Sequence, residues 1–425
     1  MEEREILQCL SDQRLELKQY ESESFIDRKE CRLIDLDSRL AQVVTGVRRS
    51  GKSTLCHMAL QNKKVEYGYV NFDDDRLANL KVNDLNIVLT CVYRIYGTDI
   101  KYLFFDEIQN VDGWHLFVSR LLRQGHRILI TGSNAKLLSS ELSTHLTGRY
   151  NEIKLFPFSF RDFCHQRGVE TKDLSTKNIA NLKNALDSYL MEGGFPELSY
   201  IRNKRGYIDG LVNTIINKDI SLRYRIRNTE GLKALANHLI NNVAQFIDVV
   251  QLSNDLGIGV EKTIRNYIDY LSQAYLVLPL SKFSFKSRIR LRNEKGYVVD
   301  NGMFTYHEQN LSTDNLGWRL ENVVYLELLR RNSPLLQEIY YYRQTPRSPE
   351  VDFVVTDRCI VKELIQVSYS LNNEKTYKRE VKALVEASGK TRCDNLLLIT
   401  MDQTKTIEFD GKTIKIISAI DWLLC

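Results

Sequence analysis

The clearest chemistry in the chain lies in one glycine-rich run. Residues 46–53 read GVRRSGKS, which fits the spacing GxxxxGK followed by Ser or Thr of a phosphate-binding loop. An apolar, strand-like run precedes it and a helical pattern follows, so backbone N–H groups and a helix N-terminus can surround phosphate oxygens. We expect Lys52 to reach the β- and γ-phosphates and Ser53 to ligate Mg2+. The residues predicted to bind ATP are Gly46, Arg48, Arg49, Ser50, Gly51, Lys52, Ser53 and Thr54.

A pair of acidic residues supplies the partner that this loop needs. Asp106 and Glu107 end the apolar run YLFF, and open α/β sheets bind their ligands at the carboxyl ends of the strands. We expect Asp106 to hold Mg2+, and Glu107 to orient and deprotonate the attacking water. Capping of the next helix is the alternative role for such a pair.

Two more residues are candidates for contact with the reacting phosphate. Asn134 follows the apolar run RILITGS, where its amide can hydrogen-bond the γ-phosphate or the water; the alternative is a helix N-cap. Arg149 can stabilise transition-state charge in its own subunit or in a neighbouring one; an ordinary surface ion pair is the alternative. The predicted catalytic residues are therefore Lys52, Glu107, Asn134 and Arg149.

The segments that must position these residues alternate strand-like and helical patterns. The apolar runs in residues 41–160 are AQVVTG, VEYGYVNF, KYLFFDE, RILITGS and NEIKLF. Several are apolar on both faces, as buried parallel strands are. The pattern predicts an α/β fold, with a parallel sheet covered by helices on both faces.

The remaining chain changes character three times. Residues 2–20 are charged and helix-prone, which predicts a solvated helix or arm, and residues 161–230 predict a helical lid. Residues 231–305 predict three helices and then a hairpin with strands at 275–278 and 282–292, the order of a winged helix. Residues 306–425 predict another α/β unit. The expected domains are 1–24, 25–160, 161–230, 231–305 and 306–425.

Several motifs, taken in their order, resemble one family. They are GVRRSGKST, VNFDDDRL, YLFFDEIQN, ILITGSNAKLLS, LTGR, FPFSFRDF and GGFPE. Nearly the whole chain resembles bacterial and archaeal AAA-type ATPases that carry a winged-helix domain and a C-terminal restriction-endonuclease-like domain. The resemblance implies an oligomeric, ring-forming ATPase, with a hexamer as the expected ring, in which Arg149 acts on a neighbouring subunit. It also implies a role on DNA.

The C-terminal unit raises the question of a second metal site. Nucleases of this fold hold Mg2+ between carboxylates and use a lysine to help activate water. Glu321, Asp352 and Gln366 stand in the expected order of elements and are tentative metal ligands. Gln366 replaces the usual acid and Ser368 the usual lysine, so we favour a degenerate fold kept for DNA binding or assembly. Lys362, Lys375, Lys378 and Arg379 are candidates to replace the lysine.

A basic run precedes that unit. Its cations alternate with apolar residues, so they share one face of a predicted strand. Such a ribbon beside a helix-turn-helix can follow DNA phosphates; a solvated strand face is the alternative. The predicted DNA-binding residues are Lys282, Lys286, Arg288, Arg290 and Arg292.

Bulk properties set outer limits on function. The net charge of +5 is too weak by itself to indicate a nucleic-acid partner. The start of the chain lacks a signal-peptide pattern, no long apolar run predicts a membrane span, and the scattered cysteines predict no zinc site, so we expect a cytoplasmic protein.

Three functions remain open from the sequence. We favour an oligomeric ATP hydrolase that moves or remodels duplex or branched DNA, with ATP and Mg2+ as cofactors. A regulatory switch, controlled by ATP and working with a protein partner, is the second reading. An ATP-gated, Mg2+-dependent DNA nuclease is the third.

Overall fold

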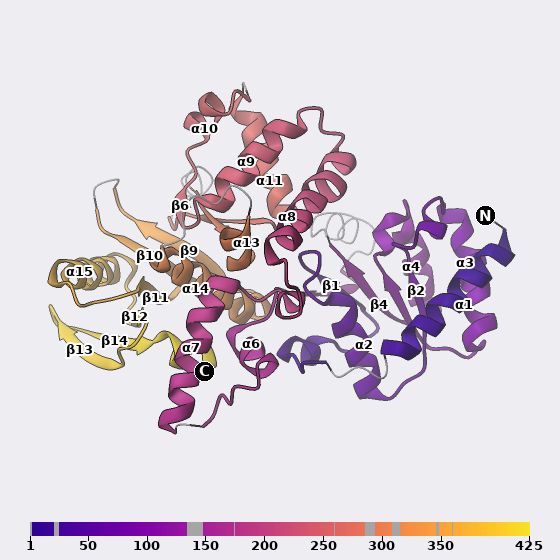
Figure 1. Ribbon diagram of the computed structural model, residues 1–425, viewed down its shortest axis with the longest axis horizontal. Helices are drawn as coiled ribbons and strands as arrows, with labels where there is room; N and C mark the ends of the chain where they lie inside the picture. The colour runs from indigo at the N-terminus through magenta and orange to yellow at the C-terminus, as the bar shows by residue number, and fades with distance from the viewer. Residues whose placement is uncertain are drawn as a thin grey trace. The chain divides into compact units, whose positions relative to one another are not determined.

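The chain divides into two compact units, Met1–Leu155 and Phe156–Cys425. The computed structural model, drawn in Figure 1, describes residues 2–20, 25–133, 148–173, 175–258, 260–284, 294–307, 315–345, 348–358 and 360–425.

A five-stranded sheet forms the centre of the first unit. Its order is β2-β3-β4-β1-β5, and each neighbouring pair is parallel. The predicted α/β core with a parallel sheet is therefore confirmed. The strands are β1 (Ala41–Thr45), β2 (Tyr67–Asn71), β3 (Tyr102–Asp106), β4 (Arg127–Gly132) and β5 (Tyr150–Lys154).

Helices cover both faces of this sheet. On one face, α2 (Lys52–Lys63) buries Leu55 and Cys56 against Val44 and Phe104. On the other face lie α1 (Glu3–Tyr20), α3 (Leu85–Tyr96) and α4 (Trp114–Arg123). Figure 1 shows α1 beside α3.

The prediction of a solvated N-terminal helix is wrong. Ile6, Cys9 and Leu10 of α1 are fully buried and belong to the core of the first unit. These three residues lie three and four positions apart, so they form one apolar stripe on an otherwise charged helix. The helix therefore contributes to the stability of the ATP-binding unit.

Helices open the second unit. They are α6 (Phe160–Gln166), α7 (Thr176–Glu192) and α8 (Lys204–Thr214), which continues as a π-helix over Ile215–Leu222. After them come α9 (Thr229–Asn241), α10 (Val249–Asp255) and α11 (Glu261–Gln273). This order agrees with the helical stretch and the three following helices that the sequence predicts.

A small sheet follows these helices. It has the order β6-β8-β7, built from β6 (Gln245–Phe246), β7 (Val277–Ser281) and β8 (Glu294–Val298). The second hairpin strand is predicted at 282–292, of which residues 285–292 lie outside the described residues. Among the described residues, Glu294–Val298 forms the strand β8 that pairs with β7, and Gly296–Val298 is buried.

A mixed six-stranded sheet completes the second unit. Its order is β13-β14-β12-β11-β10-β9, and α15 (Glu374–Thr391) packs on one face. Tyr325 of α14 (Leu316–Asn332) stacks on Phe353 at the other face. Two short helices are α13 (Asn301–Tyr306) and α16 (Ala419–Leu424). The strands are β9 (Glu338–Arg343), β10 (Glu350–Asp357), β11 (Ile360–Ser368), β12 (Leu396–Thr400), β13 (Lys405–Phe409) and β14 (Lys412–Ser418).

A buried aspartate joins the turn after α7 to the segment after β8. Asp300 accepts hydrogen bonds from the N–H groups of Gly194 at 2.6 Å and Gly302 at 2.8 Å. A Cβ atom on Gly193 would lie 1.8 Å from an oxygen of Asp300. The turn can therefore reach the carboxylate only with glycine at this position.

Candidate functional site

The loop between β1 and α2 is shaped by its glycines. A Cβ atom on Gly46 would lie 2.0 Å from the carbonyl oxygen of Leu155, and Gly51 has a φ of +90°. Backbone N–H groups can line the loop only because side chains are missing at these places. Lys52 is 6% exposed, and its Nζ donates to the carbonyl of Val47 at 3.2 Å.

Asp106, at the end of β3, lies against the start of α2. The hydroxyl of Ser53 donates to Asp106 Oδ1 at 3.0 Å, so two oxygens suited to Mg2+ are adjacent. Burial and the neighbouring Glu107 raise the pKa of Asp106 to about 6, against hydrogen bonds from Thr131 and Ser53. A cation beside Asp106 would favour its ionised form.

Glu107 is held in an unusual backbone conformation. Its φ is +52°, in the left-handed region that residues other than glycine seldom adopt. The carboxylate lies 3.7 Å from Lys52 Nζ and accepts from the N–H of Ser133 at 3.3 Å. Strain of this kind is stored most often at functional sites.

Two positioning residues escape sequence analysis. Thr131 of β4 donates to Asp106 and accepts from the N–H of Glu107 at 3.1 Å, so one hydroxyl contacts both acidic residues. Gln109 is 8% exposed, and its amide donates to the carboxylate of Glu107. The sequence signals for these two residues are the polar Thr131 in the apolar run ILIT and a glutamine two places after Glu107.

The loop's arginines make contacts of their own. Arg48 lies 3.7 Å from Asp73, and both have further interactions. Arg49, with a φ of +69°, and Thr54, in the first turn of α2, complete the predicted loop. Arg28, 4% exposed, donates to the carbonyl of Ser50 at 3.1 Å and supports the loop from outside its motif.

Arg149 lies at the opposite end of the parallel strands from the phosphate-binding loop. It precedes β5, and its carbonyl accepts from the N–H of Ala41, the first residue of β1. The loop follows the last residue of β1, roughly 13 Å away along the strand. The backbone of Arg149 therefore lies at the other end of β1 from the loop, and its catalytic role stays a prediction. Asn134 lies outside the described residues.

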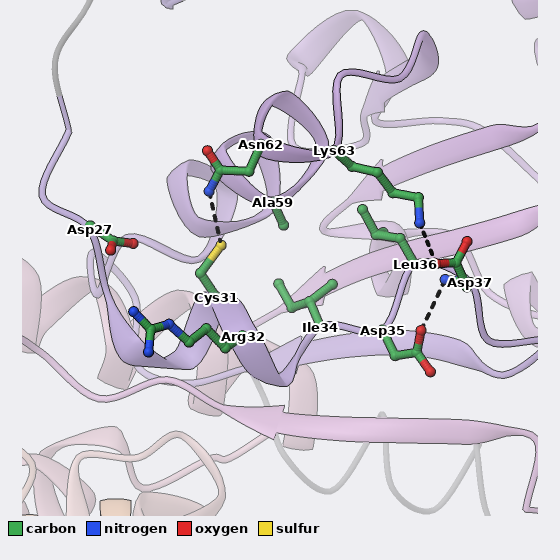
Figure 2. A pocket seen from close by; sticks show the side chains of 10 residues that line it. All are labelled: Asp27, Cys31, Arg32, Ile34, Asp35, Leu36, Asp37, Ala59, Asn62 and Lys63. Carbon is green, nitrogen blue, oxygen red and sulfur yellow. Dashed lines mark hydrogen bonds and ion pairs between the residues drawn. The ribbon is translucent and has the colours of Figure 1, made fainter.

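A separate cavity of about 400 Å³ lies near the far end of α2 (Figure 2). Lys63 pairs with Asp37 at 2.5 Å, and Asn62 lies 3.8 Å from the sulfur of Cys31. Ten or more residues of helix, about 15 Å, separate these side chains from Lys52. This cavity is therefore distinct from the phosphate loop.

The first unit contains a recognised domain. The family model described as an AAA domain matches residues 38–164, and two domains of unknown function, DUF8612 and DUF4143, match residues 183–315 and 316–420. An uncharacterized protein of Methanocaldococcus jannaschii, MJ1544, is 38% identical over 84% of this chain and 80% of its own length. The chain carries an AAA domain and belongs to the same family as MJ1544. An uncharacterized protein of Haemophilus influenzae is 31% identical over 91% of this chain and 95% of its own.

Similarity to solved structures is weaker. The Thermotoga maritima RuvB Holliday junction branch migration motor is 16% identical over 56% of this chain and 81% of its own, with a TM-score of 0.28. AMPPCP-bound DnaA from Aquifex aeolicus is 15% identical over 58% of this chain and 89% of its own, with a TM-score of 0.26.

The tentative metal ligands of this AAA protein do meet in one cleft. Glu321 of α14, Asp352 of β10 and Gln366 of β11 line a cavity of about 640 Å³ in the second unit. Glu380 and Arg379 of α15 line it as well. Sequence order therefore predicts this meeting correctly, although the three residues span 45 positions of the chain.

The hydrogen bonds in this cleft occupy the predicted ligands. The carbonyl oxygen of Gln366 accepts from the N–H of Asp352 at 3.2 Å, and its amide donates to Glu380 at 2.7 Å. Asp352 accepts from the N–H of Val367 at 2.9 Å. Burial and the neighbouring Glu321 raise the pKa of Asp352 well above its usual range.

A lysine missed by sequence analysis enters the same cleft. Lys295 of β8 lies 2.8 Å from both Glu321 and Glu350. Burial alone would lower the pKa of Lys295, but the carboxylates of Glu321, Asp352 and Glu350 raise it above its usual value. Of the residues expected to replace a missing lysine, Arg379 lines the cleft and pairs there with Glu380, whereas Lys362 pairs with Asp357 and Lys378 with Glu374.

These residues do not fit a divalent metal. Within the described ranges, no group of three or more His, Cys, Asp or Glu side chains is arranged to hold one. Gln366 turns its oxygen to the backbone, and Lys295 already contacts Glu321. The tentative metal site at Glu321, Asp352 and Gln366 is therefore not supported by the geometry.

The predicted DNA-binding run can be followed only at its start. Lys282 makes a bridge to Tyr341 of β9, and burial lowers the pKa of Lys282 below its usual value. Lys286, Arg288, Arg290 and Arg292 lie outside the described residues. Among the described helices, none has both the length and the apolar character needed to cross a membrane.

Proposed function

We propose that this protein hydrolyses Mg2+-ATP at the carboxyl edge of the first sheet. One observation carries the proposal: Lys52, Ser53, Asp106 and Glu107 come from two separate elements and meet within hydrogen-bonding or ion-pair distance. Such a set supplies a phosphate-binding cation, two oxygen ligands for Mg2+ and a carboxylate base.

Each residue has a distinct role in this proposal. The N–H groups of the loop and Lys52 bind the phosphates, while Ser53 and Asp106 hold Mg2+. Glu107 orients the attacking water and accepts its proton, as a carboxylate within reach of the γ-phosphate can. Mg2+ supplies charge neutralisation at the phosphates. Asn134 remains a proposed partner of the γ-phosphate.

The proposed working form is an oligomer. Arg149 is exposed and lies at the opposite sheet edge from the loop of its own chain. A guanidinium in that place suits an ATP site in a neighbouring copy, where it would stabilise transition-state charge. A closed ring, with a hexamer as the expected form, repeats this contact at each interface.

DNA is the proposed partner. The arrangement of α9, α10 and α11 beside the small sheet β6-β8-β7 supports a winged-helix reading. The basic run from Lys282 to Arg292 joins β7 to β8, at the place of a wing. ATP-driven changes between subunits would move this element along the phosphates of duplex or branched DNA.

The decisive experiment measures ATP hydrolysis by the wild type and by Glu107→Gln. It compares no DNA, single strands, duplex and a four-way junction at moderate salt. We expect hydrolysis that DNA accelerates severalfold and that Glu107→Gln abolishes. The DNA form that accelerates most then identifies the substrate.

Hydrolysis that is indifferent to every DNA would overturn the DNA role and favour a regulatory switch with a protein partner. If the wild type binds no nucleotide, the ATPase proposal itself is overturned. Mg2+-dependent DNA cleavage that Asp352→Ala abolishes would favour the nuclease reading, against which the contacts of Gln366 and Lys295 count.

A further inference from the structure

A buried lysine connects three elements of the second unit. The side chain of Lys295 is 4% exposed, and its Nζ lies 2.8 Å from Glu321 Oε1 and 2.8 Å from Glu350 Oε1. A buried cation is tolerated when paired charges and hydrogen bonds replace its lost water. Lys295 therefore fixes β8 to α14 and β10 at a single point.

Other protein groups complete the neutralisation of this cleft. Tyr297, two residues after Lys295, donates its hydroxyl to Glu321 Oε1 at 2.6 Å. Arg343 lies 3.9 Å from Glu350, and Arg379 pairs with Glu380. The carboxylates of the cleft thus find cations and donors within the chain, which is the task that Mg2+ performs in a metal site.

We propose that the ammonium of Lys295 takes the place of a divalent cation in the C-terminal cleft, which makes the cleft a metal-independent joint between β8, α14 and β10. Its N–H groups draw Glu321 and Glu350 together as a metal ion would. The ammonium nitrogen carries no lone pair, so Lys295 cannot accept a proton from water and its role in the joint is structural. The inference is independent of the proposed ATP hydrolysis.

The position of the joint gives it a consequence for the basic run. Lys295 is the second residue of β8, immediately after the run that ends near Arg292. The joint therefore anchors the return strand of the proposed wing to the C-terminal sheet. A pull on the basic run would be passed to α14 through Lys295 and Glu321.

The first test is thermal. Lys295→Met leaves two half-buried carboxylates without their cation, so we expect the melting temperature of the second unit to fall by roughly 10 °C. Lys405→Ala removes an exposed lysine of the same unit and should leave the melting temperature unchanged. The triple variant Lys295→Met, Glu321→Gln, Glu350→Gln removes cation and anions together and should recover most of the loss.

The triple variant also decides the matter when Lys295→Met fails to fold. A triple variant that folds and melts near the wild type supports the joint. An unchanged melting temperature in Lys295→Met, or a triple variant as unstable as the single one, would overturn it.

The second test uses Mn2+ as the probe. It is made in an Asp106→Asn background, so that the proposed ATP site does not contribute. We expect no saturable Mn2+ binding at millimolar concentration by electron paramagnetic resonance, and no change in melting temperature. Binding of one Mn2+ with Lys295 present, lost in Asp352→Ala, would overturn the proposal.

Discussion

The carboxylate of Glu107 is positioned by neighbours that the phosphate-loop motif does not include. Gln109 donates to this carboxylate from a side chain that is 8% exposed, and the N–H of Ser133 donates to the same oxygen. In the proposed mechanism, hydrolysis needs this carboxylate aimed at the water, whereas nucleotide binding does not. Gln109 should therefore affect the chemical step more than affinity.

Gln109→Ala is expected to lower kcat for ATP by about 10- to 100-fold with little change in KM, because general-base catalysis contributes about 10²- to 10⁴-fold and Gln109 only orients the base. Steady-state hydrolysis, combined with binding of a fluorescent ATP analogue, measures the two effects. Gln124→Ala, an exposed glutamine at the end of α4, is the control. Equal losses of affinity and turnover would show that Gln109 supports the fold alone.

Gly46 gives a steric prediction. Gly46→Ala places a methyl group 2.0 Å from the carbonyl oxygen of Leu155, so the loop must move and nucleotide affinity should fall by at least about tenfold. Gly125→Ala is the matched control, since its φ of +94° is similarly strained but no atom lies within 4 Å. Equilibrium binding of the ATP analogue distinguishes them; equal losses would attribute the effect to backbone strain.

At the residue scale, the sequence predicts the reactive residues of the ATP site better than the residues that hold them in position. Lys52, Asp106 and Glu107 stand in motifs whose spacing is local, so their meeting can be expected. Lys295 lies 26 and 55 residues from its two partners, in a strand without any acidic neighbour on its own face. Only the pairing of β8 with β7 and its packing on α14 bring these charges together.

At the scale of elements, α1 is a structural part of the ATP-binding unit. Leu10→Ala is expected to lower the free energy of unfolding by about 2–5 kcal/mol, because Leu10 is fully buried. Leu15→Ala, on the exposed side of the same helix, should change it by less than about 0.5 kcal/mol. Urea unfolding of the two variants measures the difference. Similar small effects would mean that α1 does not pack in solution as described.

Asp300 gives the turn after α7 a dependence on pH. Burial raises the pKa of Asp300 to about 7, against hydrogen bonds from Gly194 and Gly302. Between about pH 4 and 7 the folded protein keeps a proton that the unfolded chain has released. The free energy of unfolding therefore falls as pH rises through this window and becomes level above it.

The measurement is urea unfolding of the second unit between pH 5 and 8. The wild type should lose roughly 2–3 kcal/mol from this group, and Asp300→Asn should lack that slope. Glu230→Gln removes an exposed carboxylate of α9 and should keep the slope of the unfolding free energy with pH. A slope that survives in Asp300→Asn would assign the effect to other groups.

Predictions of elements succeed where burial is simple. The central strands β1, β3 and β4 are buried on both faces and lie at their expected places. The packing of α1 escapes sequence analysis because a narrow apolar stripe is hidden among many charges. The strand predicted at 282–292 lies mostly outside the described residues, and the described strand that pairs with β7 is the buried run that includes Gly296–Val298.

At the scale of the whole molecule, the role proposed for Arg149 allows assembly to be tested by measuring ATP hydrolysis. Lys52→Ala destroys its own loop but keeps Arg149, whereas Arg149→Ala keeps an intact loop. If Arg149 acts on a neighbouring copy, an equal mixture of the two inactive variants should recover about a quarter of wild-type hydrolysis per subunit, because about half of the subunits have an intact loop and about half of those have a neighbour that keeps Arg149. Hydrolysis of mixtures at several ratios measures this recovery.

The double variant Lys52→Ala, Arg149→Ala mixed with wild type is the control for simple exchange of subunits. A mixture of the single variants that stays inactive, although light scattering shows mixed oligomers, would remove Arg149 from the proposed mechanism.

Placing the loop and Arg149 at opposite edges of one sheet gives each subunit a direction. In an open row of such subunits, the loop of one terminal subunit has no arginine from a neighbour. Closing the row into a ring supplies the missing arginine to that loop. Turnover per subunit would then rise in a single step at closure and, before it, increase with protein concentration. The rate would report the geometry of the assembly as directly as a measurement of its mass.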